Sequence, residues 1–425
     1  MLDLDAVREH PNRVREAMRA KGEDRPEQVD ALLEVDEERR ALITELQEAQ
    51  ARSNRISKQI GALMREGKQE EAQAHIDETS ALKEKISELE EEVREKKALT
   101  EQMLLQLPNI PHRSVPVGAS EEDNEVEEEV GEKPTFDFDP QPHWELIDAL
   151  GLVDFERGAK VTGAGFPIYT GKGARLQRAL IQFFLDQAHE NGYTEVQPPL
   201  FINEDSARGT GQLPDKEDLM YEIPREGFFP IPTAEVPVTN MHRDEIFDAD
   251  DLPRTYCAYT PCFRREAGSY GAHVRGLNRM HQFDKVELVQ FVTPEESYRA
   301  LEAMCADAES LLQALGLPYR RLLMCTGDMG FTQAKKYDLE VWSAGQERWL
   351  EVSSVSNFEA FQARRMQIRY RPEPEAKPQL VHTLNGSALA LPRIIAALIE
   401  QYQTEDGIVE LPEVLHTYTR FETVG

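Results

Sequence analysis

The residues best suited to chemistry lie between positions 254 and 287, in a stretch rich in arginine. Two short β-type runs, 256–263 and 280–289, flank a middle part rich in Gly, Ser and Arg, which predicts an antiparallel hairpin with a long loop. Arginine binds phosphate oxygens as a planar fork, and the loop holds four: Arg264, Arg265, Arg275 and Arg279. The alternative is that these arginines are simply solvated, because arginine is mostly a surface residue.

Glu266 adds an acceptor beside these donors. Residues two apart in a strand share a face, so Arg264 and Glu266 are expected to reach one site. They would offer a fork for phosphate oxygens and an acceptor for an amino group. Phe283 gives the returning strand a flat apolar surface. The pattern indicates a phosphate site next to an acceptor and an apolar plate.

Two later stretches add a cation and a carboxylate. Residues 385–402 predict a Gly turn into an apolar helix, with a stripe of Ile394, Ile395, Leu398, Ile399 and Tyr402. Arg393 lies in the apolar start of this helix, where a charge is costly unless an anion such as phosphate pairs with it. Residues 351–357 predict a half-polar strand that contains Glu351, Ser353 and Ser354. A carboxylate and a hydroxyl there could hold Mg²⁺, which usually takes one or two carboxylates and nucleotide phosphates.

Sequence words in and around these stretches resemble a known family. Residues 194–199 (TEVQPP), 263–266 (FRRE) and 386–393 are similar to the three signatures of class II aminoacyl-tRNA synthetases. Four further words resemble bacterial seryl-tRNA synthetases: TAEVP (233–237), RGLNRMHQFDKVE (275–287), YDLEVW (337–342) and SNFEAFQARR (356–365). The resemblance implies a ligase that uses ATP to attach L-serine to tRNA(Ser) through a seryl-adenylate, and to tRNA(Sec) if the host has one. It also implies an α+β fold with an antiparallel sheet flanked by helices.

The resemblance assigns roles to individual residues. Arg264 would bind the α-phosphate of ATP and Arg393 its γ-phosphate, and these two with Glu351 form the catalytic set. Glu351 and Ser354 would hold Mg²⁺. The ATP-binding set is Arg264, Arg265, Glu266, Met280, Phe283, Glu351, Val352, Ser353, Ser354 and Arg393, with Glu266 on the adenine amino group and Phe283 stacked on the ring. The serine-binding set is Thr233, Ala234, Glu235, Glu287 and Ser387. For Glu287 the alternative is an ordinary ion pair with Lys285 or Arg279.

Two places depart from the family pattern. Ala388 stands where the third signature commonly has a second glycine, and Leu391 and Pro392 precede Arg393, so Ala388 fits only with a negative φ. Tyr270, Ala272 and His273 stand where relatives commonly have Gly, Arg and Asp. Contacts of that loop with the acceptor end of tRNA are therefore not carried over.

Composition narrows the class of protein. A length of 425 residues with 40% hydrophobic content predicts two or three domains and at least one large core. No apolar run approaches a membrane span and the N-terminus lacks a signal peptide, so no membrane contact and a cytoplasmic location are expected. The cysteines form no CxxC pair, which argues against zinc and a disulfide framework: Cys257, Cys262, Cys305 and Cys325. No P-loop or dinucleotide fingerprint is present, so ATP needs another kind of site.

The formal net charge of −30 is unevenly distributed. Residues 121–132 carry acids and no base, and the whole segment 111–142 is interpreted as an acidic linker. Residues 52–68 carry five bases and one acid. This part of the chain can therefore contact a polyanion although the chain as a whole is acidic.

Residues 1–110 predict a helical domain, and the resemblance implies that this domain binds tRNA. Two short helices are expected within residues 1–22. Heptad seams follow at Leu42, Leu46, Ala49, Ser53, Ile56, Ile60 and Leu63, and at Leu82, Ile86, Leu89, Val93, Lys96, Thr100, Met103 and Leu107. With Gly67 between them, the seams predict one antiparallel coiled-coil hairpin with a basic tip at Arg52, Arg55, Lys58, Arg65 and Lys68. The alternative is an oligomerisation or spacer element. By resemblance the hairpin grips the long variable arm of tRNA through its shape.

Residues 143–425 are expected to form the catalytic domain. Within it, residues 173–191 predict an amphipathic helix with an inward stripe of Leu176, Ala179, Leu180, Phe183 and Phe184. In class II synthetases this helix and the next strand build a dimer interface, so the resemblance implies a homodimer. A threonyl or prolyl relative is disfavoured by the hairpin and by TAEVP. A catalytically inactive, RNA-binding relative is disfavoured by the intact Arg264, Glu266, Glu351 and Arg393.

Overall fold

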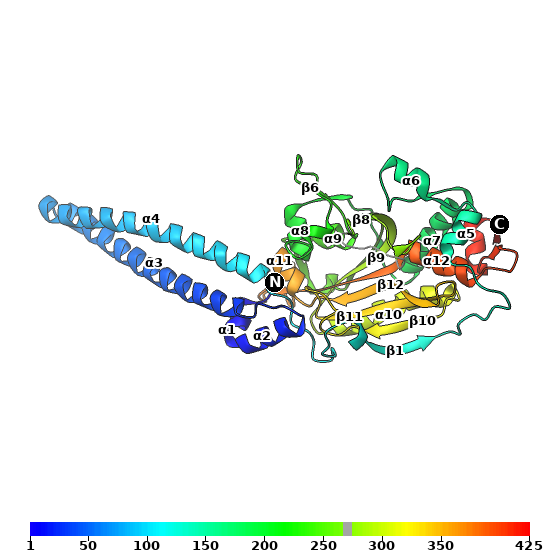
Figure 1. Cartoon of the computed structure of the whole chain (residues 1–425). Helices are drawn as coiled ribbons and strands as arrows, with labels where there is room; N and C mark the ends of the chain where they lie inside the picture. The colour runs from blue at the N-terminus through cyan, green and yellow to red at the C-terminus, as the bar shows by residue number, and fades with distance from the viewer. Residues whose placement is uncertain (267–273) are drawn as a thin grey trace. The chain divides into compact units, whose positions relative to one another are not determined.

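The computed structural model describes residues 1–266 and 274–425, which form two compact units (Figure 1). One unit comprises Leu2–Arg19 and Glu23–Pro108. The other comprises Met1, Ala20–Gly22 and Asn109–Gly425. The departures from the family pattern at Tyr270, Ala272 and His273 lie outside the described residues.

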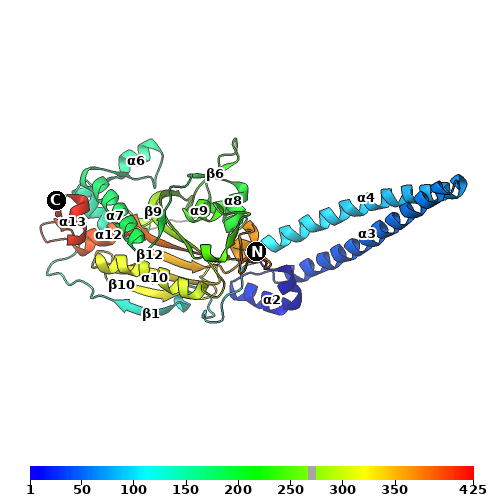
Figure 2. The same ribbon diagram turned by 180° about the vertical axis from the view of Figure 1, so that it is seen from behind.

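The N-terminal helices include a long antiparallel pair. Their bounds are α1 Leu4–Glu9, α2 Pro11–Ala20, α3 Gln28–Arg65 and α4 Gln69–Leu105. Helices α3 and α4 lie side by side in both views (Figures 1 and 2). With 38 residues, α3 is roughly 57 Å long at about 1.5 Å per residue. Residues of both predicted seams are buried between the helices, among them Ala49, Ile56, Leu89 and Thr100. The predicted hairpin is confirmed, with Gly67 in the turn at φ +77°.

Asp36 connects α1 to α3. Its side chain is fully buried and accepts hydrogen bonds from Arg8 Nε at 2.5 Å and Arg39 Nη2 at 2.7 Å. Burial acts to raise the pKa of Asp36, but the bonds to Arg8 and Arg39 outweigh it and leave that pKa lowered. The base of the hairpin is thus held by a charged carboxylate with matched donors.

An eight-stranded sheet forms the centre of the second unit, with strand order β1-β10-β11-β12-β15-β9-β8-β4. The strands in that order are Glu125–Val130, Tyr319–Leu323, Lys335–Ser343, Arg348–Asn357, His382–Ala390, Gln282–Val292, Arg254–Phe263 and Thr194–Glu195. Every neighbouring pair is antiparallel except β4 and β8. The α+β class with an antiparallel sheet is confirmed, with one parallel pair at its edge.

Helices cover both faces of this sheet. Helices α7 (Gly171–Glu190), α10 (Ser297–Ala314) and α12 (Leu391–Gln401) pack on one face. Helices α9 (Glu235–Asn240) and α11 (Phe361–Met366) pack on the other. Strand β9 shows why, because its residues alternate between two cores: Val286 and Leu288 in the first, Val289 and Phe291 in the second.

The remaining elements are short. The helices are α5 His143–Ala149, α6 Phe155–Val161, α8 Glu204–Thr210 and α13 Glu413–Thr419, with 3₁₀ turns at Glu121–Asp123, Glu217–Leu219 and Ala249–Asp251. The strands are β2 Val153–Asp154, β3 Ile168–Tyr169, β5 Phe201–Asn203, β6 Phe228–Pro230, β7 Ile246–Asp248, β13 Arg369–Arg371, β14 Gln379–Leu380, β16 Val409–Glu410 and β17 Thr423–Val424. The inward stripe predicted for α7 is confirmed, since all five of its residues are buried.

Two expectations about local structure are wrong. The acidic run is not merely a spacer, because it contains strand β1, whose Glu128 and Glu129 lie opposite Arg321 and Arg320 of β10. Arg321 Nε also lies 3.1 Å from the carboxylate of Glu127, so a cross-strand arginine offsets part of the repulsion that local sequence predicts. Gly386 is not in a turn but inside β15, which runs directly into α12.

The reason given for bringing Arg264 and Glu266 together is also wrong. Strand β8 ends at Phe263, so strand alternation does not reach them. Glu266 instead has a left-handed backbone, φ +46°. Ala388 meets its predicted condition, since it is not among the described residues with positive φ.

Candidate active site

A pocket of about 330 Å³ opens where β9, β12, β15 and the start of α12 meet. The loops that contain residues 212–220 and 277–280 complete its wall. It brings together most of the predicted site residues: Thr233, Glu235, Arg264, Glu266, Met280, Phe283, Glu351, Val352, Ser353, Ser354, Ser387 and Arg393. Of the predicted ATP- and serine-binding residues, three do not line it: Arg265, which is exposed, and Ala234 and Glu287, which are buried.

Arg264 is held at the end of β8 by backbone contacts. Its main-chain N–H donates to the carbonyl of His281 at 2.9 Å, which continues the pairing with β9 by one residue. Its side-chain Nε donates to the carbonyl of Pro232 at 3.3 Å. The guanidinium carbon lies 5.1 Å from the centre of the Phe283 ring. Arg264 and Phe283 therefore form adjoining charged and flat apolar surfaces, as nucleotide binding requires.

Glu266 has a cationic partner that was not assigned from the sequence. Arg279 Nε donates to the carboxylate of Glu266 at 2.5 Å, and both residues line the pocket. Arg279 is one of the four loop arginines, so the arginine-rich pattern was the signal for it. The pair places a second guanidinium group in the same pocket as Arg264.

Arg393 lies in the first turn of α12 and reaches back across the sheet. Its Nη1 donates to the carbonyl of Glu351 at 2.6 Å and its Nε to the carbonyl of Asn278 at 3.1 Å. Its Nη1 is also 3.9 Å from the carboxylate of Glu351. Loss of hydration in the cleft acts to raise the pKa of Glu351, but the charges of Arg393 and Lys336 outweigh it and leave the pKa lowered. Glu351 is thus anionic at neutral pH.

Lys336 and Asp338 of β11 lie next to Glu351. Lys336 Nζ is 3.1 Å from Asp338 Oδ2, and Lys336 lines the pocket. Asp338 is buried, and burial raises its pKa against the attraction of Lys336. Alternation along β11 puts Lys336 and Asp338 on the same face of the sheet. That spacing is the signal by which Lys336 could have been found from the sequence.

Glu351 and Ser354 fit a magnesium ion by their chemistry. Both line the pocket, one as a charged carboxylate and the other as a hydroxyl. Mg²⁺ keeps several waters and takes few protein ligands, so two donors are enough. Within residues 1–266 and 274–425, no group of three or more His, Cys, Asp or Glu side chains is placed to bind a metal.

A cluster of two carboxylates and one ammonium group lies deeper in the pocket. Glu287 pairs with Lys285 at 2.5 Å and accepts a hydrogen bond from Asn385 Nδ2 at 2.6 Å. Glu235 accepts from Gln362 Nε2 at 2.7 Å and from Asn385 Nδ2 at 3.3 Å. Burial, with the charge of Glu287, raises the pKa of Glu235. This two-carboxylate cluster (Glu235, Lys285, Glu287 and Asn385) suits a small molecule with an ammonium group.

Comparisons with known proteins show the family of the chain that contains this pocket. The family model of the seryl-tRNA synthetase N-terminal domain matches residues 1–111, and that of the tRNA synthetase class II core domain (G, H, P, S and T) matches residues 221–402. The chain is 72% identical over 425 residues to a serine–tRNA ligase of Salinibacter ruber, covering 100% of this chain and 99% of the relative. The chain belongs to the seryl-tRNA synthetase family. It is therefore a class II aminoacyl-tRNA synthetase that attaches serine to tRNA.

Solved structures agree with this assignment. Seryl-tRNA synthetase from Pyrococcus horikoshii, crystallised in complex with ATP, is similar to the synthetase with a TM-score of 0.95 and 38% identity, covering 100% of this chain and 99% of that chain. Cytoplasmic serine–tRNA ligase from Naegleria fowleri, in complex with AMP, gives a TM-score of 0.89 at 28% identity, covering 100% and 98%. The predicted family and fold are confirmed over the whole chain.

The basic residues predicted for tRNA binding lie on the hairpin of the synthetase. Three of them have local partners: Arg52 pairs with Glu78, Arg65 Nε donates to the carbonyl of Gly61 at 3.1 Å, and Lys68 Nζ is 2.9 Å from Glu66. Arg55 and Lys58 are exposed on α3. No helix in the described part of the synthetase is long and apolar enough to cross a membrane.

Proposed function

We propose that the synthetase works in two steps, first joining serine to ATP as a seryl-adenylate and then transferring the seryl group to tRNA(Ser). The observation that carries the proposal is one pocket lined by Arg264, Arg393 and three members of the two-carboxylate cluster, with Glu287 directly behind them on Asn385 and Lys285. The similar synthetases from P. horikoshii and N. fowleri, in complex with ATP and AMP, support the nucleotide as substrate.

In the first step a carboxylate oxygen of serine attacks the α-phosphorus of ATP, and the bond to the β-phosphate oxygen breaks to release pyrophosphate. No protein nucleophile is required, so positioning and charge stabilisation supply the catalysis. Arg264 would hold the α-phosphate, while Arg393 and the Glu266–Arg279 pair would bind the remaining phosphates and the adenine amino group. Phe283 would stack on the ring, with Met280 and the backbone of Val352 and Ser353 against the nucleotide.

Serine would be held by its ammonium group and its hydroxyl. Glu235 and Glu287 would bind the ammonium group, because the cluster has one carboxylate more than it has ammonium groups. Thr233 and Ser387 would contribute hydroxyl oxygens, while Ala234 packs in the core behind Thr233 and would not touch serine. A site that hydrogen-bonds the substrate hydroxyl rejects alanine strongly, because a buried partner would be left unpaired.

Magnesium belongs to the proposal through Glu351 and Ser354. When bound, the ion would neutralise charge on the phosphates. Lys336 would hold Asp338 and add positive charge beside Glu351. Zinc has no part in the proposal.

In the second step a hydroxyl of the terminal adenosine of tRNA attacks the seryl carbonyl carbon and AMP leaves. The hairpin would present its basic residues to the long arm of tRNA(Ser), and of tRNA(Sec) where it exists, by shape rather than sequence. The proposal includes a homodimer through α7 and β4 and a cytoplasmic location, where translation occurs.

The test is ATP–pyrophosphate exchange with serine, threonine and alanine supplied separately and without tRNA. Exchange with serine alone is expected. Exchange driven by threonine would contradict the assigned pocket, and no exchange with any of the three would favour the catalytically inactive, RNA-binding alternative. Size-exclusion chromatography with light scattering tests the dimer independently.

A further inference from the structure

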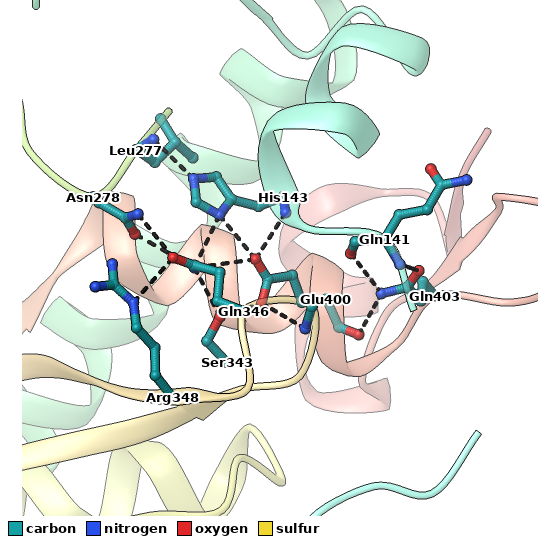
Figure 3. Close-up of polar contacts among 10 residues, drawn as sticks. Gln141, His143, Leu277, Asn278, Ser343, Gln346, Arg348, Glu400 and Gln403 are labelled. Atoms are coloured by element: carbon teal, nitrogen blue, oxygen red, sulfur yellow. Dashed lines mark hydrogen bonds and ion pairs between the residues drawn. The ribbon is translucent and has the colours of Figure 1, made fainter. Parts of the chain in front are cut away.

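A buried polar network lies behind the pocket, around His143 and Glu400 (Figure 3). His143 begins α5, Glu400 lies near the end of α12, and both side chains are fully buried. The main-chain N–H of His143 donates to Glu400 Oε1 at 2.7 Å, and its ring Nδ1 lies 2.8 Å from the same oxygen. None of the roles proposed above uses either residue.

The network fixes which ring nitrogen of His143 carries the proton. Glu400 Oε2 accepts from the hydroxyl of Ser343 and from the main-chain N–H of Gly345, at 3.0 Å in the second case. A carboxylate surrounded by donors acts as an acceptor, so Nδ1 of His143 donates to it. The other nitrogen, Nε2, accepts the main-chain N–H of Leu277 at 2.9 Å. His143 is therefore the neutral imidazole with its proton on Nδ1.

The chain packs directly on the Nε2 side of this ring. Gly276 has φ +65°, and a Cβ atom built on it would lie 2.4 Å from Nε2 of His143. Only glycine allows the backbone of residues 276–277 to approach the ring so closely. The contact between His143 and this backbone is thus built into the fold.

Two bonds lead from this network to the pocket. Leu277 and Asn278 both line the pocket, and the carbonyl of Asn278 accepts Arg393 Nε at 3.1 Å. The side chain of Asn278 donates to Gln346 Oε1 at 2.9 Å, and Gln346 Nε2 donates to Glu400 at 3.2 Å. Figure 3 shows Gln346 between Asn278 and Glu400. His143 and Gln346 therefore hold the same short segment from its backbone and its side chain.

We propose that His143 is a positioning residue for ATP. Through Nε2 it fixes Leu277 and Asn278, and the carbonyl of Asn278 then sets the orientation of Arg393, whose guanidinium group faces the phosphates. The part that concerns ATP rests on the proposed function. The competing explanation is a purely structural one, in which His143 only satisfies the buried carboxylate of Glu400.

Two substitutions separate the two ring nitrogens. His143→Asn can keep a donor near the Nδ1 position and loses the acceptor for Leu277, whereas His143→Gln can keep an acceptor near Nε2 and loses the donor to Glu400. Positioning predicts that the KM for ATP rises about 10-fold in the Asn variant, the effect of one ordinary hydrogen bond, and stays near wild type in the Gln variant. The KM for serine should be unchanged in both. A purely structural role predicts instead that the Gln variant is impaired more than the Asn variant, because only the Gln variant leaves Glu400 short of a donor.

Ser343→Ala is the matched control within the network. It removes one donor to Glu400 and one acceptor of Gln346 Nε2, which still has Glu400 as acceptor. The bond from Leu277 to His143 is kept, so the KM for ATP should stay near that of wild type. If the Asn variant does not fold, Gln346→Met tests the other hold on Asn278 and should also raise the KM for ATP. An ATP KM that rises as much in Ser343→Ala as in these variants would overturn the proposal.

Hydrogen–deuterium exchange tests the same proposal without ATP or catalysis. The peptide covering residues 274–282 should exchange faster in His143→Asn than in wild type and His143→Gln. Equal hydrogen–deuterium exchange in all three proteins would show that His143 does not hold Leu277, whatever the enzyme does with serine. Absence of serine-dependent ATP–pyrophosphate exchange in the wild type would instead contradict the proposed function alone.

Discussion

The ammonium group of Lys285 lies 2.5 Å from a carboxylate oxygen of Glu287, and both side chains are buried on strand β9. Lys285 also donates to the hydroxyl of Thr233 at 2.9 Å. Glu287 therefore forms a buried ion pair and not an ordinary surface one. Its partner, Lys285, is one of the two that the alternative named. Among the described residues, the hydrogen bonds that the carboxylate of Glu235 accepts come from the side-chain amides of Gln362 and Asn385. The cluster thus keeps one carboxylate for a cationic substrate.

Replacing Glu287 by Gln should raise the KM for serine by about 10- to 100-fold, because a hydrogen bond to a charged group is worth about 1.5–3 kcal/mol. The KM for ATP should stay within about 2-fold of wild type. Ala is the wrong replacement, since breaking a buried pair costs about 3–5 kcal/mol of stability and would confuse the result. Glu340→Gln, which removes the carboxylate paired with Arg320 outside the pocket, is the matched control. An unchanged serine KM in the Glu287 variant would rule out its proposed role.

Glu235 should cost the substrate-free protein stability at neutral pH. Burial and the charge of Glu287 raise its pKa, so the folded protein binds this proton more readily than the unfolded chain does. The penalty is absent below the ordinary Glu pKa and is complete above the raised one. Glu235→Gln should therefore melt higher than wild type at pH 7.5, and the difference should vanish as the pH falls towards 4. A gain of about 1 kcal/mol corresponds to roughly 2 °C in a protein of this size.

Thermal denaturation at several pH values measures the effect of Glu235→Gln, and serine-dependent exchange in the same samples should be lost. Gln362→Glu should lower the melting temperature at pH 7.5, because it places a further buried carboxylate next to Glu235. A Gln variant that is less stable than wild type at pH 7.5 would show that the carboxylate of Glu235 supports the fold.

Periodic patterns predicted the elements whose packing is local. The seams of α3 and α4 and the stripe of α7 lie where the sequence places them, because the seam face is partly or fully buried along α3 and α4 and the stripe of α7 is buried. The acidic strand β1 was missed because its partner strand β10, with Arg321 beside Glu127, lies almost 200 residues away in the chain. No local pattern contains that information.

The same limit applies to the pocket. Sequence words indicated Arg264, Glu351 and Arg393, whose residue types suit phosphate and metal. They did not indicate Asn385, which is 150 residues from Glu235 and joins both carboxylates only in the folded sheet. Lys285 was considered only as a surface partner, because burial of a charged strand residue cannot be read from alternation alone.

Removal of the Arg264 side chain should abolish most of the first step. Arg264→Ala is expected to lower serine-dependent exchange by about 10²–10³-fold, the usual effect of losing one preorganised electrostatic contact. Arg265→Ala is a neighbouring control, because the Arg265 side chain is exposed and does not line the pocket. It should retain activity within about 3-fold, since surface substitutions usually have small effects. Equal losses of exchange activity in both variants would mean that the conformation of the loop, rather than the Arg264 side chain, supports the first step.

Magnesium dependence should change with Glu351. Chelation of divalent cations by EDTA should stop exchange in the wild type, and added Mg²⁺ should restore it. Glu351→Gln should need about 10- to 100-fold more Mg²⁺ for half-maximal activity, as expected when a metal ligand is weakened. Binding of Mn²⁺ in the presence of ATP, followed by electron paramagnetic resonance, gives a second measurement that does not depend on turnover. Unchanged metal affinity would remove Glu351 from the proposed metal site.

Charge reversal on the hairpin should separate the two steps of the reaction. Arg55→Glu with Lys58→Glu reverses two exposed charges on α3, and the pocket lies in the other unit, so serine-dependent exchange should stay at the wild-type rate. Charging of tRNA(Ser) should fall by about 10-fold or more, because each lost phosphate contact weakens binding and lowers its dependence on salt. Lys83→Glu with Lys97→Glu makes the same change of net charge on α4 and should have a smaller effect. If both double variants charge tRNA equally well, the basic residues of α3 do not bind tRNA and the hairpin acts as a spacer or an oligomerisation element.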